Sequence, residues 1–198
     1  ADIQFQFIPP HDQQGFILIK DNMQIQSAMY GEYNAINMAA AFTVGEHFNV
    51  DRQLIIDSLS IFRSTSNRSE IITYHGCTLI KDAYNANPSS MESAIKSFSE
   101  SYPSGWLILG DMKELGSESH DLHLHIINTA ASYSFDKIIL LGKEFKAAYE
   151  NLNGKIATIS LAEDIEQLKE KWNWDECMGK SLLLKGSRSM HLEKLLED

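Results

Sequence analysis

The chain has 198 residues, of which 43% are hydrophobic and 22% are charged, the balance of an ordinary globular protein. This length allows one large domain or two small ones. The formal net charge of −10 disfavours a nucleic-acid-binding protein, which needs a basic surface to replace counterions on phosphates, although an acidic protein can still bind a single nucleotide.

The sequence has no apolar run of transmembrane length and no secretory leader. Its two cysteines, Cys77 and Cys177, are too few and too distant in sequence to suggest a disulfide framework or a metal site. We expect both to be reduced thiols of a cytosolic protein. Because the chain starts at Ala1 without a methionine, we expect it to be part of a longer protein.

The first 62 residues are expected to form a small unit of three strands and two helices. The expected strands cover 3–8, 16–20 and 23–27, a turn covers 9–15, and the expected helices cover 34–47 and 51–61. In the first helix, Ile36, Phe42 and Val44 lie among small residues and are predicted to be buried. Asp51 is the expected N-cap of the second helix.

Residues 63–69 contain no large apolar side chain, and we expect a linker over 63–67. After it, strand-like runs alternate with helix-like runs. The strands are expected at 70–74, 78–81, 106–109, 137–141, 156–160 and 181–185, and the helices at 89–100, 118–133, 144–151, 162–172 and 188–196. Such alternation predicts an α/β fold with a mainly parallel, Rossmann-like sheet and helices on both faces.

Polar residues follow the second of these strands, between Asp82 and Pro88. The carboxyl ends of strands in open α/β sheets are where ligands bind. Pro88 suits a first helical turn, and Ser89 and Ser90 can cap it. The residues left for a ligand are Asp82, Tyr84, Asn85 and Asn87. The alternative is a polar loop that only caps the following helix.

The last strand ends in Lys185-Gly186-Ser187-Arg188. A glycine that permits close approach, two cations and a helix N-terminus together favour an anion such as a carboxylate or a phosphate. The alternative is a solvated turn. The segment is not a phosphate loop of the Gly-x-x-x-x-Gly-Lys-Ser/Thr type, which occurs nowhere in this chain.

Two asparagines, Asn34 and Asn37, share one face at the start of a predicted helix, and their amides suit an adenine edge. The alternative is an N-cap at Asn34 plus one buried amide. The spacing of His120, His123 and His125 matches no metal site, and we expect His123 to make a structural hydrogen bond.

Together these segments resemble the Mur ligase family of ATP-dependent peptide ligases, and within it the enzymes that add D-alanyl-D-alanine to UDP-N-acetylmuramoyl-tripeptide. The resemblance covers nearly the whole chain. It is carried by residues 31–40, Arg68, residues 82–88, residues 109–116 with His123, and residues 184–189. It implies that residues 1–62 are the C-terminal part of the central ATP-binding domain and that 68–198 are the Mur ligase C-terminal domain. The uridine-nucleotide-binding domain, the phosphate loop and the magnesium ligands would lie outside this chain.

The resemblance also implies a mechanism. ATP phosphorylates the tripeptide carboxylate, and the amine of D-alanyl-D-alanine attacks the acyl phosphate, which a closing domain shields from water. The implied ATP contacts are Asn34, Asn37, Arg68 and Asp82; the residues at the junction of ATP and dipeptide are Tyr84, Asn85 and Asn87; and the dipeptide contacts are Lys185, Ser187 and Arg188. The chain alone would be inactive, and the whole enzyme would be a cytoplasmic monomer of peptidoglycan synthesis.

Two alternatives remain open at this point. One is a different ligase of the same superfamily, such as a sister Mur ligase or a folylpolyglutamate synthase, which differs in the amine that it accepts. The other is a non-catalytic module that binds a nucleotide or a peptide.

Overall fold

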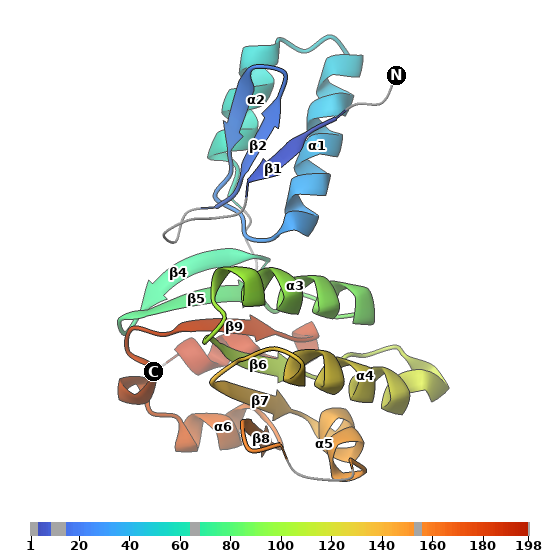
Figure 1. Cartoon of the computed structure of the whole chain (residues 1–198), viewed down its shortest axis with the longest axis vertical. Helices are drawn as coiled ribbons and strands as arrows, with labels where there is room; N and C mark the ends of the chain where they lie inside the picture. Colours follow the sequence, from blue (N-terminus) through green and yellow to red (C-terminus); the bar gives the residue numbers. More distant parts are fainter. Residues whose placement is uncertain (1–3, 9–14, 64–67, 153–155, 198) are drawn as a thin grey trace.

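The computed structural model describes residues 4–8, 15–63, 68–152 and 156–197. They form two units, with the N-terminal one stacked above the larger C-terminal one in Figure 1. Most of the predicted turn (9–14) and most of the predicted linker (64–67) lie outside the described residues.

The N-terminal unit is a three-stranded antiparallel sheet, in the order β1-β2-β3, packed against two helices. Its elements are β1 Gln6–Ile8, β2 Ile17–Lys20, β3 Met23–Gln26, α1 Glu32–His47 and α2 Arg52–Ile61. Asp51 caps α2 as predicted, because its side chain accepts the N–H of Leu54 at 3.1 Å. Leu18, Ile25 and Phe42 are buried in the core of this unit.

The buried face of α1 differs from the prediction. Phe42 is fully buried, but Ile36 is 68% exposed and Val44 is 55% exposed. The reason is that only one face of α1 meets the small sheet. Ala35, Met38 and Phe42 recur at helical spacing on that face, and Ile36 and Val44 lie off it.

The C-terminal unit is built on a six-stranded sheet in the order β4-β5-β9-β6-β7-β8. Its strands are β4 Glu70–Tyr74, β5 Cys77–Asp82, β6 Trp106–Gly110, β7 Lys137–Leu141, β8 Ile159–Ala162 and β9 Ser181–Lys185. Only β4 and β5 pair antiparallel, so the mainly parallel sheet is confirmed. The strand β8 starts three residues later than predicted, because a turn occupies residues 157–158.

Helices cover both faces of this sheet (Figure 1). They are α3 Pro88–Ser101, α4 Ser119–Ala131, α5 Lys143–Glu150 and α6 Ile165–Lys171, with 3-10 turns η1 Gly116–Glu118, η2 Trp174–Cys177, η3 Arg188–Met190 and η4 Leu192–Leu196. Leu107 packs with α3, α4 and α5, whereas its neighbour Ile108 packs with α6 and η4 on the other face. Successive side chains of a strand point to opposite faces, so each central strand contributes side chains to the hydrophobic cores on both faces of the sheet.

The final helix predicted over 188–196 is wrong. The chain forms η3 and η4 instead, because His191 between them adopts a left-handed conformation with φ 49°. A continuous right-handed helix cannot pass through such a residue.

Tyr30 joins the two units. Although it precedes α1 in sequence, its side chain is fully buried in the core of the C-terminal unit with Ile80 and Phe98. Its ring stacks on Tyr102 with the centroids 6.4 Å apart, and its backbone N–H donates to the carbonyl of Ser69 at 3.2 Å. The segment before α1 therefore packs as part of the larger unit.

The two cysteines are free thiols, as expected, but they are neighbours in space. Cys77 at the start of β5 and Cys177 at the end of η2 are both fully buried, with their sulfur atoms 3.3 Å apart. Burial raises the pKa of the Cys177 thiol to about 12, so it stays protonated at neutral pH.

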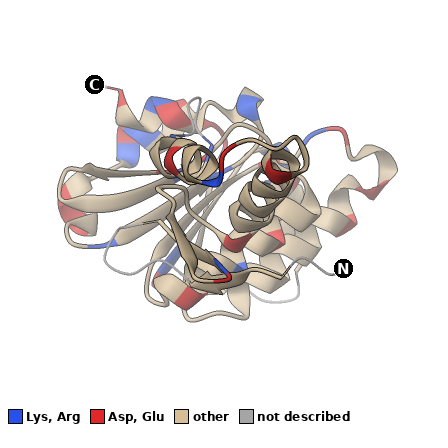
Figure 2. Ribbon diagram, turned by 90° about the horizontal axis from the view of Figure 1, so that it is seen from above, with Lys and Arg blue, Asp and Glu red and all other residues tan. Residues whose placement is uncertain are grey.

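Acidic and basic residues are interspersed over the elements in Figure 2, and the described residues form no continuous basic stripe in that view. Within the same residues, none of the helices combines the length and the apolar character needed to cross a lipid bilayer.

Candidate functional site

Three loops meet at the carboxyl edge of the large sheet. Asp82 at the end of β5 lies in register with Lys185 at the end of β9, and Lys185 in turn lies beside Leu109 near the end of β6. The loops after β5, β9 and β6 therefore converge, although about a hundred residues separate Asp82 from Lys185 in sequence. The predicted site residues of these loops come together at this edge.

The centre of the site is a buried ion pair. The ammonium of Lys185 donates to Oδ2 of Asp82 at 2.6 Å and lies 3.5 Å from the carbonyl oxygen of Asn85. Lys185 is 1% exposed and Asp82 is 8% exposed. The structure thus places Lys185 against Asp82 and not in an open pocket where its charge would meet a dipeptide carboxylate directly.

Two hydroxyl groups that the sequence analysis did not single out complete the surroundings of Asp82. Tyr33 of α1 donates to Oδ2 at 3.2 Å, and Ser69 donates to Oδ1 at 3.4 Å. The two hydroxyl oxygens are themselves 2.8 Å apart. Tyr33 lies within the segment 31–40 that carries the family resemblance, whereas the sequence signal for Ser69 was its position directly after Arg68.

A positively charged rim surrounds Tyr84. The guanidinium carbon of Arg68 lies 3.6 Å from the centre of the Tyr84 ring, and that of Arg188 lies 5.5 Å from it. Both arginines are exposed, and Tyr84 is half-buried. The two guanidinium groups come from opposite ends of the sequence of the C-terminal unit and both lie over the Tyr84 ring. Two neighbouring positive charges favour an anionic ligand.

Asn87 caps the helix after this loop. Its Oδ1 accepts the backbone N–H of Ser90 at 2.9 Å and the hydroxyl of Ser89 at 3.0 Å, while Ser90 accepts the N–H of Asn87 in a capping box. The N-cap is Asn87, and of the two serines predicted to cap this turn, Ser90 does so through its side chain in the capping box. The Oδ1 of Asn85 likewise turns back and accepts the N–H of Ala86 at 2.9 Å. The amide oxygen of Asn87 therefore caps the following helix, as the alternative interpretation of this polar loop predicted.

Ser187 links the last loop to the loop after β6. Its hydroxyl accepts the N–H of Lys113 at 3.1 Å, and its own N–H donates to the carbonyl of Asp111 at 3.2 Å. The two backbones are so close that a Cβ on Gly186 would lie 2.9 Å from the Cα of Gly110. A side chain at Gly186 would therefore push the two loops apart.

Asp111 is part of the scaffold of the site and not an open acid. It is 1% exposed, and its carboxylate accepts the N–H groups of Glu144 and Phe145 at 3.2 and 3.0 Å. Asp111, directly after β6, therefore caps the N-terminus of α5. The helix dipole favours a negative charge at that end of the helix.

His123 makes a structural hydrogen bond, as predicted. Its Nε2 accepts the N–H of Met112 at 3.0 Å, and its Nδ1–H donates to the carbonyl of Ser119 at 2.7 Å. Burial lowers the pKa of His123 below its usual value, although the Ser119 carbonyl and the Asp111 carboxylate act in the opposite direction. The ring is neutral, since a proton on Nε2 would break the bond to Met112.

We expect this bond to make the fold sensitive to acid. An unfolded histidine takes up a proton near pH 6.5, whereas folded His123 resists it, so unfolding free energy is lost as the pH falls below about 6.5 toward the lowered folded pKa. Urea titrations at about pH 7.5 and about pH 5.5 measure this loss. His123→Gln should reduce the difference between the two pH values, and His120→Gln, at a position whose side chain is 43% exposed, should not. An unchanged pH dependence in His123→Gln would contradict the assignment.

The two asparagines of the proposed adenine site differ in their contacts. The amide of Asn34 donates to the carbonyl of Tyr30 at 2.7 Å, and Asn37, one turn further along α1, is exposed. The N-cap of α1 is Gly31, with φ 92°, so the alternative in which Asn34 caps this helix is wrong.

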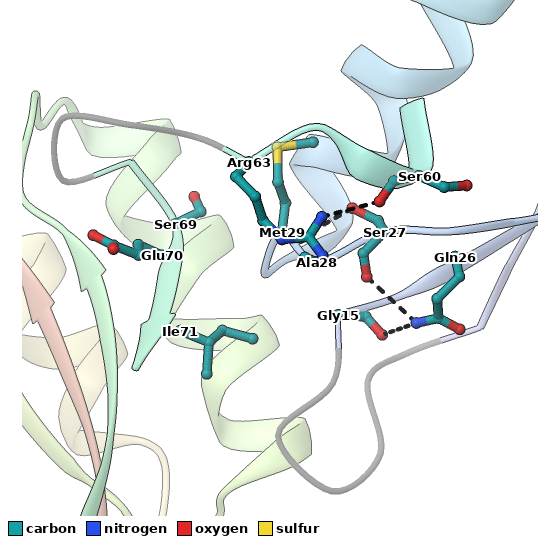
Figure 3. Close-up of a pocket in the computed structure, with 10 residues that line it drawn as sticks. All are labelled: Gly15, Gln26, Ser27, Ala28, Met29, Ser60, Arg63, Ser69, Glu70 and Ile71. Carbon is teal, nitrogen blue, oxygen red and sulfur yellow. Dashed lines mark hydrogen bonds between the residues drawn. The ribbon is translucent and has the colours of Figure 1, made fainter. Parts of the chain in front are cut away.

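A separate pocket of about 480 Å³ lies between the two units (Figure 3). It is lined by Gly15, Gln26, Ser27, Ala28, Met29, Ser60, Arg63, Ser69, Glu70 and Ile71. The Arg63 guanidinium there donates to the carbonyl groups of Ser60 and Phe62, at 3.0 and 3.1 Å. None of the predicted site residues lines this pocket, although Ser69, which donates to Asp82, does.

Within the described ranges, no group of three or more His, Cys, Asp or Glu side chains is placed to hold a metal ion. The two acids nearest the site do not fit Mg²⁺, because Asp82 is paired with Lys185 and Asp111 caps α5.

The fold, with this edge of polar loops, matches a known family of domains. The family model described as Mur ligase, glutamate ligase domain, matches residues 67–188. The chain therefore belongs to the Mur ligase family.

Among curated relatives, the UDP-N-acetylmuramoyl-tripeptide–D-alanyl-D-alanine ligase of Bacillus subtilis is 31% identical over 173 residues, which cover 85% of this chain and 38% of that protein. The enzyme of the same name from Escherichia coli is 27% identical over 173 residues, with 84% and 36% covered. The chain thus spans well under half the length of these relatives.

Solved structures agree on the fold. MurF from Acinetobacter baumannii superposes with a TM-score of 0.81 at 25% identity, over 97% of this chain and 43% of that one. MurF ligase from Thermotoga maritima in complex with ADP gives a TM-score of 0.75 at 20% identity, over 98% and 44%. The predicted fold class and family are both confirmed.

Proposed function

We propose that this chain is the C-terminal part of an ATP-dependent ligase that adds D-alanyl-D-alanine to UDP-N-acetylmuramoyl-tripeptide during peptidoglycan precursor synthesis in the cytoplasm. The observation that carries the proposal is the edge where the loop after β5 holds the buried acid Asp82 and, two residues later, the Tyr84 ring with Arg68 and Arg188 over it. Such an edge can accept hydrogen bonds from sugar hydroxyls and hold an anion at once. The names of the two curated relatives described above support the choice of substrate.

In this proposal, residues 1–62 are the end of the central ATP-binding domain. Residues 63–67 are a linker, and residues 68–198 are the C-terminal domain. Asn34 and Asn37 contact adenine from α1, and Asp82 accepts from the ribose hydroxyls. Arg68 stabilises the nucleotide phosphates through its exposed guanidinium. The two parts of the nucleotide would therefore be held by different units.

The junction between ATP and dipeptide would be lined by Tyr84, Asn85 and Asn87. Arg188 and Ser187 would bind the dipeptide, with the guanidinium on its carboxylate. The burial of Lys185 supports an indirect part for it, in which its ammonium holds Asp82 in place while the neighbouring residues meet the dipeptide.

The chemistry would be an acyl phosphate formed on the tripeptide carboxylate and attacked by the dipeptide amine. Phosphoryl transfer depends mainly on positioning and charge stabilisation, to which Arg68 would contribute. The phosphate loop and the magnesium ligands would be supplied by the rest of a monomeric ligase, and this chain alone would not turn over.

Arg68→Ala tests the nucleotide part of the proposal. In the whole ligase we expect the KM for ATP to rise by roughly tenfold, the loss expected for one charge-assisted hydrogen bond, while the KM for the UDP-muramoyl substrate is unchanged. Steady-state release of phosphate measures both constants.

Arg63→Ala is the matched control, because Arg63 is also an exposed arginine near the boundary of the two units, and its hydrogen bonds to described residues go to the carbonyl groups of Ser60 and Phe62. It should leave both constants unchanged. Equal effects of the two substitutions would count against a nucleotide site at Arg68. A ligase that accepts glutamate or diaminopimelate but not D-alanyl-D-alanine would instead support a sister ligase.

A further inference from the structure

Tyr33 reaches from one unit of the protein to the other. It lies on the first turn of α1 in the N-terminal unit, directly before Asn34. Its hydroxyl, however, contacts Ser69 at 2.8 Å and Asp82 at 3.2 Å, and both of these residues belong to the C-terminal unit. A single side chain therefore connects the helix of the proposed adenine site with the proposed ribose site.

The hydroxyl of Tyr33 acts as a hydrogen-bond donor to Asp82. Burial raises the pKa of Tyr33 well above its usual value, and the nearby Asp82 charge raises it further, so the phenol keeps its proton. Lys185 and Ser69 supply the other two donors to this carboxylate, one from β9 and one from the residue directly before β4. Of the three donors, only Tyr33 comes from the N-terminal unit.

Two residues near Tyr33 in the chain, Tyr30 and Asn34, also connect the start of α1 to the C-terminal unit. The carbonyl of Tyr30 accepts from the amide of Asn34, and Tyr30 itself is buried in the C-terminal core. Movement of α1 relative to β5 would therefore break the contact of Tyr33 with Asp82. The contact couples the position of Asn34 to the position of the Asp82 carboxylate.

We propose that Tyr33, supported by Ser69, is a positioning residue that holds Asp82 at the distance from Asn34 that adenosine requires. This inference rests on the proposed function, because it needs Asp82 to accept from ribose hydroxyls. Tyr33 does not touch the nucleotide. It acts by keeping the carboxylate oriented, so that less ordering is needed when the nucleoside binds.

The test is a comparison of two ligands in the intact ligase. Isothermal titration measures the affinity for ADP and for 2′,3′-dideoxy-ADP, which lacks the ribose hydroxyls. The wild-type ligase is expected to bind ADP roughly tenfold more tightly than the dideoxy ligand. Tyr33→Phe is expected to weaken ADP binding roughly fivefold and to leave the dideoxy affinity unchanged.

Two further variants make the test specific. Ser69→Ala should change the two affinities in the same direction as Tyr33→Phe, and it serves as the second variant if Tyr33→Phe does not fold. Tyr133→Phe is the matched control, because Tyr133 packs against the same core but takes no part in the contacts to Asp82, and it should change neither affinity.

The possible outcomes distinguish the ribose role of Asp82 from the positioning role of Tyr33. If the wild-type ligase binds both ligands equally, the ribose role of Asp82 is wrong and this inference is overturned with it. If the wild type discriminates and the Tyr33 and Ser69 variants discriminate equally well, the proposed function stands and the positioning role is wrong. Equal losses for both ligands in Tyr33→Phe would show a merely structural effect and would also overturn the inference.

Discussion

Lys185→Met is expected to destabilise the chain by about 3–5 kcal/mol, because removing one partner of a buried ion pair leaves the other charge uncompensated. The side chains of Lys185 and Asp82 are only 2% and 11% exposed, so water cannot replace the lost ammonium. Methionine keeps most of the apolar stem of lysine and thus isolates the effect of the charge. Urea denaturation followed by circular dichroism measures the change.

Lys180→Met is the matched control for this substitution. Lys180 pairs with Asp136 at 2.7 Å, but the two side chains are 41% and 42% exposed. Exposed pairs contribute about 0–1 kcal/mol, so this variant should unfold almost like the wild type. The double variant Asp82→Asn/Lys185→Met should recover part of the lost stability, since it removes both charges. Wild-type stability in Lys185→Met would mean that the ammonium does not bind Asp82 in solution, and Lys185 would again be a direct candidate for the dipeptide carboxylate.

Gly142→Ala is expected to cost about 3 kcal/mol or more, because both the backbone and the available space exclude a side chain there. Gly142 has φ 119° and ψ 170°, a region that only glycine adopts readily. A Cβ at this position would also overlap the carboxylate of Asp111, which caps α5. The substitution would therefore displace Asp111 and weaken the support of the loop after β6. Thermal and urea unfolding measure the loss.

Gly116→Ala provides the comparison. Gly116 also has a positive φ, at 57°, but its Cβ would meet no atom within 4 Å. Only the backbone penalty applies, and we expect a loss of about 1–2 kcal/mol. Similar losses in the two variants would show that the crowding at Asp111 contributes little and that the conformation of Gly142 alone sets the cost.

The strands of the large sheet were predictable because their signal is local. Runs such as Leu107-Ile108-Leu109 are apolar at every position, as expected for strands that are buried on both faces, and the structure confirms them. The cap of α2 at Asp51 was equally local. The helix predicted over 188–196 failed because the left-handed conformation of His191 has no reliable signal in a single sequence.

The contacts that build the site were much harder to predict, because they join distant parts of the chain. The loops could be found from the strands that precede them. That Lys185 binds Asp82, or that Asp111 accepts the N–H of Glu144, 33 residues further along, depends on the packing of the whole sheet. The partners Tyr33 and Ser69 depend in addition on how the two units meet, which periodicity within either unit cannot reveal.

The place of Tyr30 determines where the chain can be divided for study. A recombinant piece that starts at residue 68 follows the linker in the sequence, but it leaves an empty space of one aromatic ring beside Phe98 and Tyr102. Cavities of that kind cost several kcal/mol and expose the core to water. A design that supplies the segment around Tyr30, either covalently or as a short peptide added in trans, would refill this space. Binding of such a peptide would then report directly on the adhesion between the two units.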